Sequence, residues 1–259
     1  MAEGDTILRA ARRIEAAIGG DQVEVSAPNP RGRMSGVQRL DGRTLERVDA
    51  HGKHLLLDFG ELTLHSHLGM SGSWHIYPRG GAWRKPAGAA WAVIRGKSSE
   101  AVQFGGPTLR LLRAGALRRD PTLSRLGPDI LAPDFNPDAI TSSLRAHPHR
   151  ALGDALLDQA LIAGIGNIFK SEACFAARTD PWRTVGELED RELERVLRAA
   201  RELMLAAVET GRHPHNVYRR ANWPCLRCGT PIRSRGQGDD NRTAYWCPSC
   251  QRGEDPPGA

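Results

Sequence analysis

The sequence lacks any run of 18 or more apolar residues, which excludes a membrane-spanning helix. Its first residues are acidic, and they lack the basic start and apolar stretch of a secretory signal peptide. We therefore expect a cytoplasmic protein with no membrane partner, in a compartment where thiols stay reduced. The chain has 259 residues, of which 40% are hydrophobic, enough for one or two domains with a buried core.

Cysteine is scarce, and four of the five cysteines form two Cys-x-x-Cys pairs near the end of the chain. Cys228 and Cys247 are separated by 18 residues, within the range of roughly 15–20 residues expected for a four-cysteine zinc site. Two such turns, Cys225 to Cys228 and Cys247 to Cys250, supply the tetrahedral sulfur ligands of a structural zinc ion. Two disulfides or four free thiols are the alternative, which the doubled pattern disfavours. The remaining Cys174 is expected to be a small buried apolar side chain.

The segment between the two cysteine pairs predicts a hairpin. Residues 230–234 form the outgoing arm, residues 236–240 the tip, and residues 243–246 the returning arm. Arg242 lies beside the tip, which makes it a candidate for contact with a partner.

Lysine is also scarce, with four lysines against 32 arginines. The formal charge is +6 and the pI about 9.4, and a zinc ion bound by four thiolates would reduce the charge to +4. Arginine suits bidentate contacts with phosphate, although base-composition bias in the genome also produces such a skew. A basic balance together with a zinc finger favours a nucleic-acid partner.

The first 20 residues predict an amphipathic helix over residues 4–18, stopped by Gly19 and Gly20, with Asp5 and Thr6 as candidate caps. A free α-amine at the positive end of a helix has its charged form disfavoured, so it would be more nucleophilic at neutral pH. Glu3 is the acid/base side chain beside it. A frayed, idle terminus is the alternative.

Residues 23–117 predict a β-sandwich or barrel, because short alternating segments are broken by glycine and proline. The candidate strands are residues 44–48, 54–59, 63–67, 73–77, 91–94 and 101–104.

Two turns in this region carry candidate functional side chains. Lys53 follows Gly52 between two predicted strands, where a solvated charge is the alternative interpretation. Met70 lies in a glycine-rich turn, residues 67–73, and is either a wedge for a base stack or a core residue.

The second half of the chain predicts helices after a linker rich in proline, aspartate and glycine. The predicted helices are residues 138–145, 151–162, 168–177 and 190–209. The junction at residues 163–167 predicts a tight turn, where backbone amides and the Asn167 side chain suit a phosphate. His213 and His215 are not expected to bind zinc, because four sulfurs fill the shell.

Five collinear segments resemble the formamidopyrimidine-DNA glycosylase/endonuclease VIII family. They are Glu-Gly-Asp-Thr at residues 3–6, Gly-Lys-His at 52–54, His-Leu-Gly-Met-Ser-Gly at 67–72, Leu-Leu-Asp-Gln at 156–159 with Gly-Ile-Gly-Asn-Ile at 164–168, and Arg242 with Tyr-Trp-Cys-Pro-Ser-Cys-Gln at 245–251. The first segment resembles the endonuclease VIII branch.

The resemblance implies an α+β multidomain fold with a structural Zn²⁺. We expect an N-terminal β-sandwich catalytic domain at residues 1–118, a linker at 119–136, a helix–two-turns–helix DNA-binding domain at 137–221 and a zinc finger at 222–253. It also implies a monomeric, nucleoid-associated bacterial protein whose partner is damaged DNA. Both duplex and single-stranded or bubble DNA stay open as substrates.

The resemblance implies a bifunctional DNA glycosylase and AP lyase that removes oxidised bases, with pyrimidines favoured, and cuts the strand by β,δ-elimination. Glu3 would protonate the opening deoxyribose ring, and Lys53 would hold a phosphate and the sugar near the reacting carbon.

Four further residues are implied in DNA binding. Asn167 and Arg242 would hold phosphates around the lesion. His67 would lie near the DNA backbone, and Met70 would fill the gap left by the everted nucleotide.

One position departs from the family pattern. The family's nucleophile is a proline exposed by removal of the initiator methionine, and here the position holds Ala2. A secondary amine forms a permanently cationic iminium, whereas a primary amine forms an imine that must be protonated. The sequence therefore favours either reduced lyase activity or a non-catalytic binder of damaged or abasic DNA. A zinc-ribbon transcription factor is disfavoured, since it needs no sandwich domain with an acid/base at its start.

Overall fold

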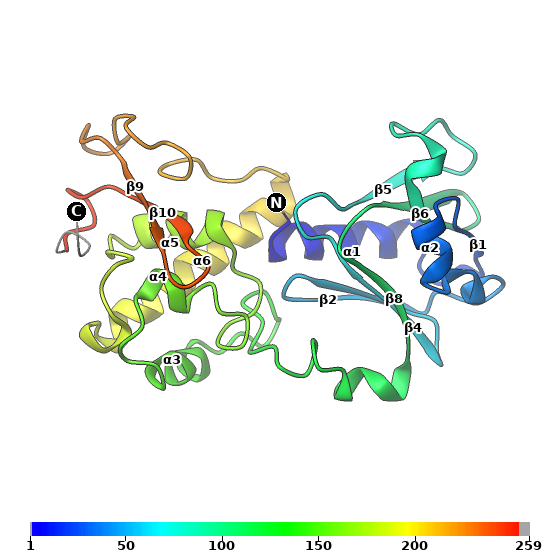
Figure 1. Cartoon of the computed structure of the whole chain (residues 1–259), viewed down its shortest axis with the longest axis horizontal. Helices are drawn as coiled ribbons and strands as arrows, with labels where there is room; N and C mark the ends of the chain where they lie inside the picture. The colour runs from blue at the N-terminus through cyan, green and yellow to red at the C-terminus, as the bar shows by residue number, and fades with distance from the viewer. Residues whose placement is uncertain (1, 254–259) are drawn as a thin grey trace. The chain divides into compact units, whose positions relative to one another are not determined.

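The computed structural model describes residues 2–253, apart from the side chain of Arg118. The chain divides into two compact units, one ending at Arg125 and the other beginning at Leu126 (Figure 1). In residues 2–253, the structure contains no helix with the length and apolar character needed to cross a membrane.

The first unit is built on two four-stranded antiparallel sheets, as the predicted sandwich requires. One sheet has the order β1-β6-β7-β5, formed by β1 (Glu24–Ser26), β6 (Ala90–Arg95), β7 (Ser99–Phe104) and β5 (Ser73–Pro78). The other has the order β2-β3-β4-β8, formed by β2 (Arg47–His51), β3 (His54–Asp58), β4 (Leu62–His67) and β8 (Thr108–Arg113). In the second sheet, Leu55, Leu57 and Leu64 point into the core, so the alternate residues lie on the opposite face.

Helix α1 (Gly4–Ile18) packs against both sheets and closes the core of this unit (Figure 1). Ile7, Ile14 and Ile18 are buried on one side of the helix, which confirms the predicted helix and its bounds. The predicted caps are wrong. Glu3 occupies the N-cap without a side-chain capping bond, and Asp5 lies buried in the first turn.

The predicted strand at residues 44–48 is displaced in the structure, where β2 begins at Arg47. The Leu45 amide instead donates to the Asp21 carbonyl, and Thr44 forms an isolated bridge with Gln22. Strands β1 and β8 were not predicted. The short helices of this unit are α2 (Pro30–Met34), η1 (Val37–Leu40), η2 (Ala87–Ala89) and η3 (Ala114–Arg119).

The second unit is helical up to its finger, with α3 (Pro137–Arg145), α4 (Leu152–Ala155), α5 (Asn167–Ala176), η4 (Val185–Glu187) and α6 (Asp190–Thr210). Helix α5 is buried over nearly its whole length between α6 and β10 (Arg242–Trp246). The predicted helix at residues 151–162 is wrong, since helical structure ends after one turn at Ala155. The Asp158 carboxylate caps the Ala160 amide at 2.9 Å and turns the chain instead.

The predicted hairpin forms the end of this unit. β9 (Arg233–Gln237) pairs with β10 in antiparallel register, with Arg242 opposite Gln237. A small core of Phe175, Val217, Ile232 and two of the cysteines supports it. Helix α5 therefore contacts the returning strand of the hairpin directly.

Candidate functional site

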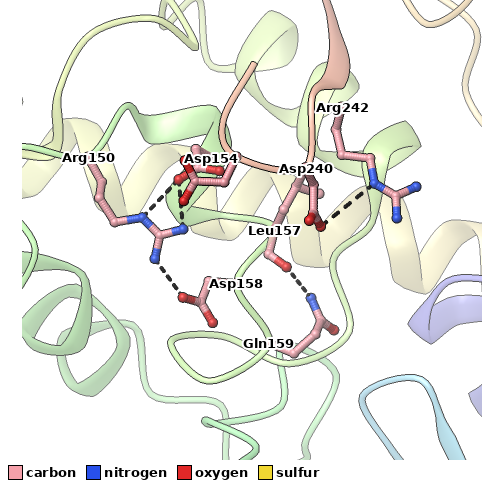
Figure 2. Close-up of a pocket in the computed structure, with 8 residues that line it drawn as sticks. Arg150, Asp154, Leu157, Asp158, Gln159, Asp240 and Arg242 are labelled. Carbon is pink, nitrogen blue, oxygen red and sulfur yellow. Dashed lines mark hydrogen bonds and ion pairs between the residues drawn. The ribbon is translucent and has the colours of Figure 1, made fainter. Parts of the chain in front are cut away.

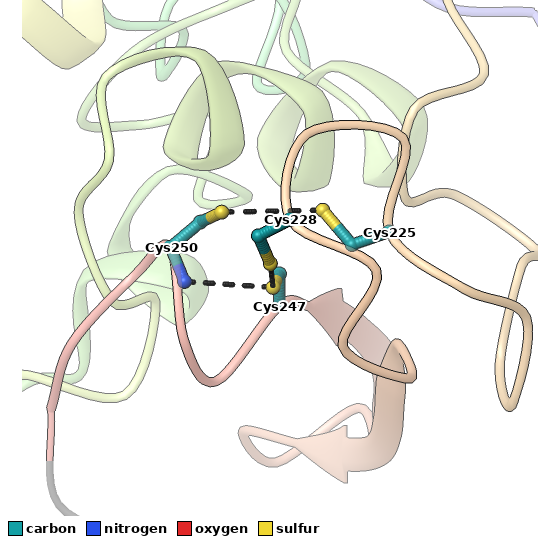
Figure 3. Close-up of side chains that lie close together, drawn as sticks. All are labelled: Cys225, Cys228, Cys247 and Cys250. Atoms are coloured by element: carbon teal, nitrogen blue, oxygen red, sulfur yellow. Dashed lines mark hydrogen bonds between the residues drawn. The ribbon is translucent and has the colours of Figure 1, made fainter.

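The four paired cysteines gather at the base of the hairpin (Figure 3). Their sulfur atoms all lie within 4.8 Å of one another, and this is the only such ligand group among residues 2–253. Cys225 and Cys250 are 3.9 Å apart at sulfur, and Cys228 and Cys247 are 3.5 Å apart. Four sulfurs around a zinc ion, at the usual bond length of about 2.3 Å, lie about 3.8 Å from one another. The spacing therefore fits one tetrahedral metal ion.

Backbone amides support the same interpretation. The Arg227 amide lies 3.4 Å from the Cys225 sulfur, and the Cys250 amide lies 3.5 Å from the Cys247 sulfur. Such N–H groups stabilise thiolate ligands of a metal by donating hydrogen bonds to the sulfur atoms. The donor set therefore suits a structural metal, with the protein supplying every ligand.

Side-chain contacts hold the segment around the first cysteine pair against α5. The Glu172 carboxylate, 1% exposed, accepts bonds of 2.8–3.0 Å from the backbone amides of Asn216, Val217 and Tyr218. The Arg227 guanidinium lies 4.2 Å from the centre of the Phe175 ring and donates to the Phe175 carbonyl. The segment before the first cysteine is therefore held by one buried acid.

The turn before α5 positions Asn167 at the start of that helix. Gly164 has φ of 106°, a left-handed conformation that suits glycine, and the Gln159 side chain bonds the Gly164 amide and the Ile165 carbonyl. The Asn167 Nδ2 donates to the Thr243 carbonyl at 2.8 Å. This bond brings the helix start next to the strand that begins with Arg242.

A pocket of about 330 Å³ opens beside Arg242 (Figure 2). Its charged lining consists of Arg150, Arg242 and four aspartates, namely Asp154, Asp158, Asp239 and Asp240. Arg150 bonds both Asp154 and Asp158. Burial opposes ionisation of Asp158, but the Arg150 bond, the Ala160 amide and the nearby positive charge together outweigh it, so the pKa of Asp158 lies below its usual value. Two arginines against four aspartates make the pocket interior unfavourable for a phosphate.

Arg242 lines this pocket and is also half-exposed to solvent. Its guanidinium is 4.0 Å from the Asp240 carboxylate, and its side chain is 49% exposed. An exposed ion pair of this length contributes little, so Arg242 is available to an external anion.

In the first unit, the chain start is tied to the turn between β4 and β5. The Ala2 nitrogen donates to the Gly69 carbonyl at 3.3 Å. Glu3 follows directly and is fully buried. Met70, one residue beyond the bonded carbonyl, is 74% exposed. The structure therefore excludes the core-filling interpretation of Met70.

Lys53 lies in the two-residue turn between β2 and β3. Gly52, with φ of 55°, takes the first position of that turn, and His51 pairs with His54 to close it. Burial and the nearby charge of Lys53 lower the pKa of His67 on the neighbouring strand. Lys53 and His67 therefore form one local group.

Two histidines to which the sequence motifs assigned no role lie beside this group. His54 Nδ1 is 2.8 Å from His65 Nε2, and both residues are buried. Burial, together with neighbouring cationic groups, lowers the pKa of His54 to about 3 and that of His65 to about 4. A signal was present in the sequence, because His65 and His67 are two residues apart and so share one face of a strand.

Cys174 is fully buried, and burial raises its pKa to about 12, which confirms the prediction of an inert apolar side chain. His213 makes an edge contact with Phe169. It is not part of the cysteine cluster.

A β-sandwich unit followed by a helical unit with a four-cysteine hairpin defines a class of DNA glycosylases and AP lyases, and comparison with family models supports this. The formamidopyrimidine-DNA glycosylase N-terminal domain matches residues 1–105, and the formamidopyrimidine-DNA glycosylase H2TH domain matches residues 126–218. The chain belongs to the formamidopyrimidine-DNA glycosylase/endonuclease VIII family.

Curated relatives carry names from the endonuclease VIII branch. A probable endonuclease 8 2 of Streptomyces coelicolor is 43% identical, over 99% of this chain and 96% of that protein. The DNA-(apurinic or apyrimidinic site) lyase Nei2 of Mycolicibacterium smegmatis is 34% identical, over 97% of this chain and 99% of that protein.

Solved structures share the fold. The Lactococcus lactis Fpg in complex with DNA containing an abasic site aligns with a TM-score of 0.81 at 21% identity, over 97% of this chain and 100% of that chain. The MutM (Fpg) protein of Thermus thermophilus aligns with a TM-score of 0.78 at 29% identity, over 98% of this chain and 100% of that chain.

Proposed function

We propose that this protein removes oxidised bases from DNA, pyrimidines above all, and then cuts the abasic strand by β,δ-elimination. The observation that carries the proposal is the arrangement around the chain start. A fully buried acid, Glu3, directly follows a residue whose nitrogen is bonded to the turn that presents Met70. The endonuclease 8 and AP lyase names of the relatives support the same activity.

The chemistry requires a nucleotide outside the base stack, because a base inside a duplex cannot be reached. Met70, with its exposed apolar side chain, would enter the gap. The amine exposed after removal of the initiator methionine would attack C1′ of the everted nucleoside. Met1 lies outside the described residues, so its removal is part of the proposal.

Glu3 would donate a proton to the ring oxygen as the deoxyribose opens. Loss of the base would leave an imine between Ala2 and C1′. When protonated, this imine would accept the electrons released as the C2′ proton leaves and the 3′ phosphate is expelled. A second elimination would then expel the 5′ phosphate. Lys53 and His67 would hold the sugar and the adjoining phosphate.

Asn167 and Arg242 would hold other phosphates of the damaged strand. Their support is the bond from Asn167 to the Thr243 carbonyl and the exposure of the Arg242 side chain. We propose Zn²⁺ as the metal, because four thiolates at tetrahedral spacing are the donor set that Zn²⁺ prefers. Its role would be to stiffen the hairpin, with no part in the reaction.

A second candidate is a non-catalytic binder of damaged or abasic DNA, which Ala2 in place of proline favours. Borohydride trapping on abasic DNA, together with base release from duplexes carrying oxidised pyrimidines, separates the two. We expect a weak covalent adduct with Ala2 and a stronger one after Ala2→Pro. No adduct and no base release with Ala2, but both with the proline variant, would establish the binder.

The same assays on matched duplex, bubble and single-stranded oligonucleotides decide which of these DNA forms is the substrate. Sedimentation with and without DNA tests the proposed monomer. Two protein chains per abasic site would refute it.

A further inference from the structure

A chain of hydrogen bonds crosses one face of the second sheet, and none of its members is a residue that would touch DNA. Arg110 on β8 donates from Nη2 to the Asp120 carboxylate at 2.7 Å and from Nε to His65 Nδ1 at 3.0 Å. His65 Nε2 is in turn 2.8 Å from His54 Nδ1. His65 is 1% exposed and His54 is 8% exposed, so the two histidines are shielded from water.

The Arg110 guanidinium determines which ring nitrogen of each histidine carries a proton. Arginine only donates hydrogen bonds, so His65 Nδ1 must accept and carries no proton. The proton of His65 then lies on Nε2 and is donated to His54 Nδ1. The proton of His54 consequently lies on its own Nε2. Each histidine is therefore neutral and in the Nε2–H form.

The far end of the chain reaches the group formed by Lys53 and His67. His54 immediately follows Lys53 and closes its turn by pairing with His51. The His54 ring centre is also 4.8 Å from that of His67, which pairs with His54 across β3 and β4. Any shift of the His54 ring would therefore move both neighbours.

We propose that His65 and His54 are positioning residues, held as neutral imidazoles by Arg110, that set Lys53 and His67 in place for the sugar-phosphate of the substrate. This inference rests on the proposed function, since Lys53 and His67 have their assigned roles only in that reaction.

The surroundings explain why neutrality matters. The groups that face the pair are cationic or titratable to a cation, namely His51 on β2, His67 on β4 and Arg110 on β8, and Lys53 in turn faces His67. The acid near the pair, Asp120, is bonded by Arg110 and by the amides of Thr122 and Leu123. A proton added to either histidine would be repelled by Arg110, and burial would leave that charge poorly solvated.

The first measurement reads the protons directly. Long-range ¹H–¹⁵N NMR spectra of the full-length, zinc-loaded protein with ¹⁵N-labelled histidine distinguish the two neutral tautomers and the protonated ring. We expect His54 and His65 in the Nε2–H form, with no titration between about pH 5 and pH 8. An Nδ1–H form, or titration of either ring near its ordinary pKa, would overturn the assignment.

The second measurement follows function in two variants of the same residue. His65→Gln retains one acceptor for Arg110 and one donor for His54, whereas His65→Leu removes both. We expect single-turnover cleavage of abasic DNA to stay within about twofold of the parent rate for the glutamine variant. For the leucine variant we expect a fall of about 10-fold or more, since small misplacements of reacting groups have effects of this size.

The pH profile separates positioning from a general loss of structure. In His65→Leu, His54 loses its hydrogen-bond donor and one of the neighbours that lower its pKa, so an acid-side fall in rate should begin at a higher pH than in the parent. His149→Gln, which changes an exposed histidine of the second unit, is the matched control and should leave rate and profile unchanged. Equal rates and unchanged profiles for the leucine and glutamine variants would refute the proposal. An inactive parent protein with the expected tautomers would refute the proposed function instead.

Discussion

The nitrogen of Ala2 and the carbonyl of Gly69 are joined by a hydrogen bond of 3.3 Å, so the start of the chain is tied to the turn that presents Met70. Gly69 has φ of 57°, and a Cβ built on it would lie 2.8 Å from Cδ of Pro107. This turn is therefore held from two sides, by the chain start and by the proline.

Replacement of Gly69 by alanine tests this coupling. We expect the free energy of unfolding to fall by about 1–2 kcal/mol, because alanine is strained in the left-handed conformation. We also expect the lyase rate to fall, because the clash displaces the Ala2 contact. Gly80→Ala is the control, since Gly80 has φ of 72° but open space around its Cβ. Urea unfolding should show similar stability losses for the two variants. Single-turnover cleavage should be slower for Gly69→Ala alone. Equal rates would show that the contact is dispensable.

Met70→Ala should affect function and leave the fold intact. The side chain is 74% exposed, so its removal should change the unfolding free energy by less than about 0.5 kcal/mol. Base release from duplex DNA should fall, and cleavage of a single-stranded abasic oligonucleotide should change less, because no stack has to be held open there. Leu68→Ala, at a side chain 2% exposed, should instead cost about 2–5 kcal/mol. A duplex rate unaffected by Met70→Ala would exclude the wedge.

Arg242→Gln should weaken binding to all DNA sequences alike. If Arg242 contacts a phosphate, the slope of log K against log salt should fall in magnitude by about 0.9. Arg198→Gln provides a matched control, because Arg198 is an exposed arginine on α6 paired with Glu194. Fluorescence anisotropy between 50 and 200 mM salt measures both slopes. An unchanged slope for Arg242→Gln contradicts the assignment.

Stability should depend on pH through the buried histidine pair. The folded pKa values of about 3 and about 4 lie below the ordinary value of 6.5, so the unfolded chain binds protons that the folded chain does not. Stability is then full above pH 6.5 and is lost as pH falls towards 4, by up to about 1.4 kcal/mol per pH unit for each histidine. Urea midpoints at pH 7.5 and 5.0, compared between the parent and His54→Phe, should show a shallower dependence in the variant. Parallel curves would mean that His54 binds its proton normally.

Removal of the metal should unfold the hairpin and abolish DNA binding. The core of the hairpin is small and includes two of the cysteines, so metal binding energy supplies much of its folding energy. We expect one zinc per chain by elemental analysis, and loss of both zinc and affinity on chelation or in Cys228→Ser. Full affinity in metal-free protein would rule out the structural role. Cys174→Ser, at the buried cysteine outside the cluster, controls for thiol loss and should keep the zinc.

Much of the fold was predictable because its signals are local. The bounds of α1 followed from apolar residues at helical spacing, and the cysteine spacing predicted the cluster that the structure forms. The helix predicted over residues 151–162 failed because a side chain competed with the backbone. The Asp158 carboxylate accepts a hydrogen bond from the Ala160 amide, and the apolar segment continues as turns in place of a helix.

The sequence by itself determined the helical and strand periodicities, the sulfur ligands and the motifs that resemble the family. Tertiary structure alone decided which distant residues meet, because the pairing of β2, β3, β4 and β8 and the approach of α5 to β10 are non-local. The tertiary structure brings the Asn167 side chain within hydrogen-bond distance of the Thr243 carbonyl. It also brings Arg110, His65 and His54 into one series of hydrogen bonds. The charge state of the two histidines follows from that alignment, because burial and an arginine donor determine which ring nitrogen carries the proton.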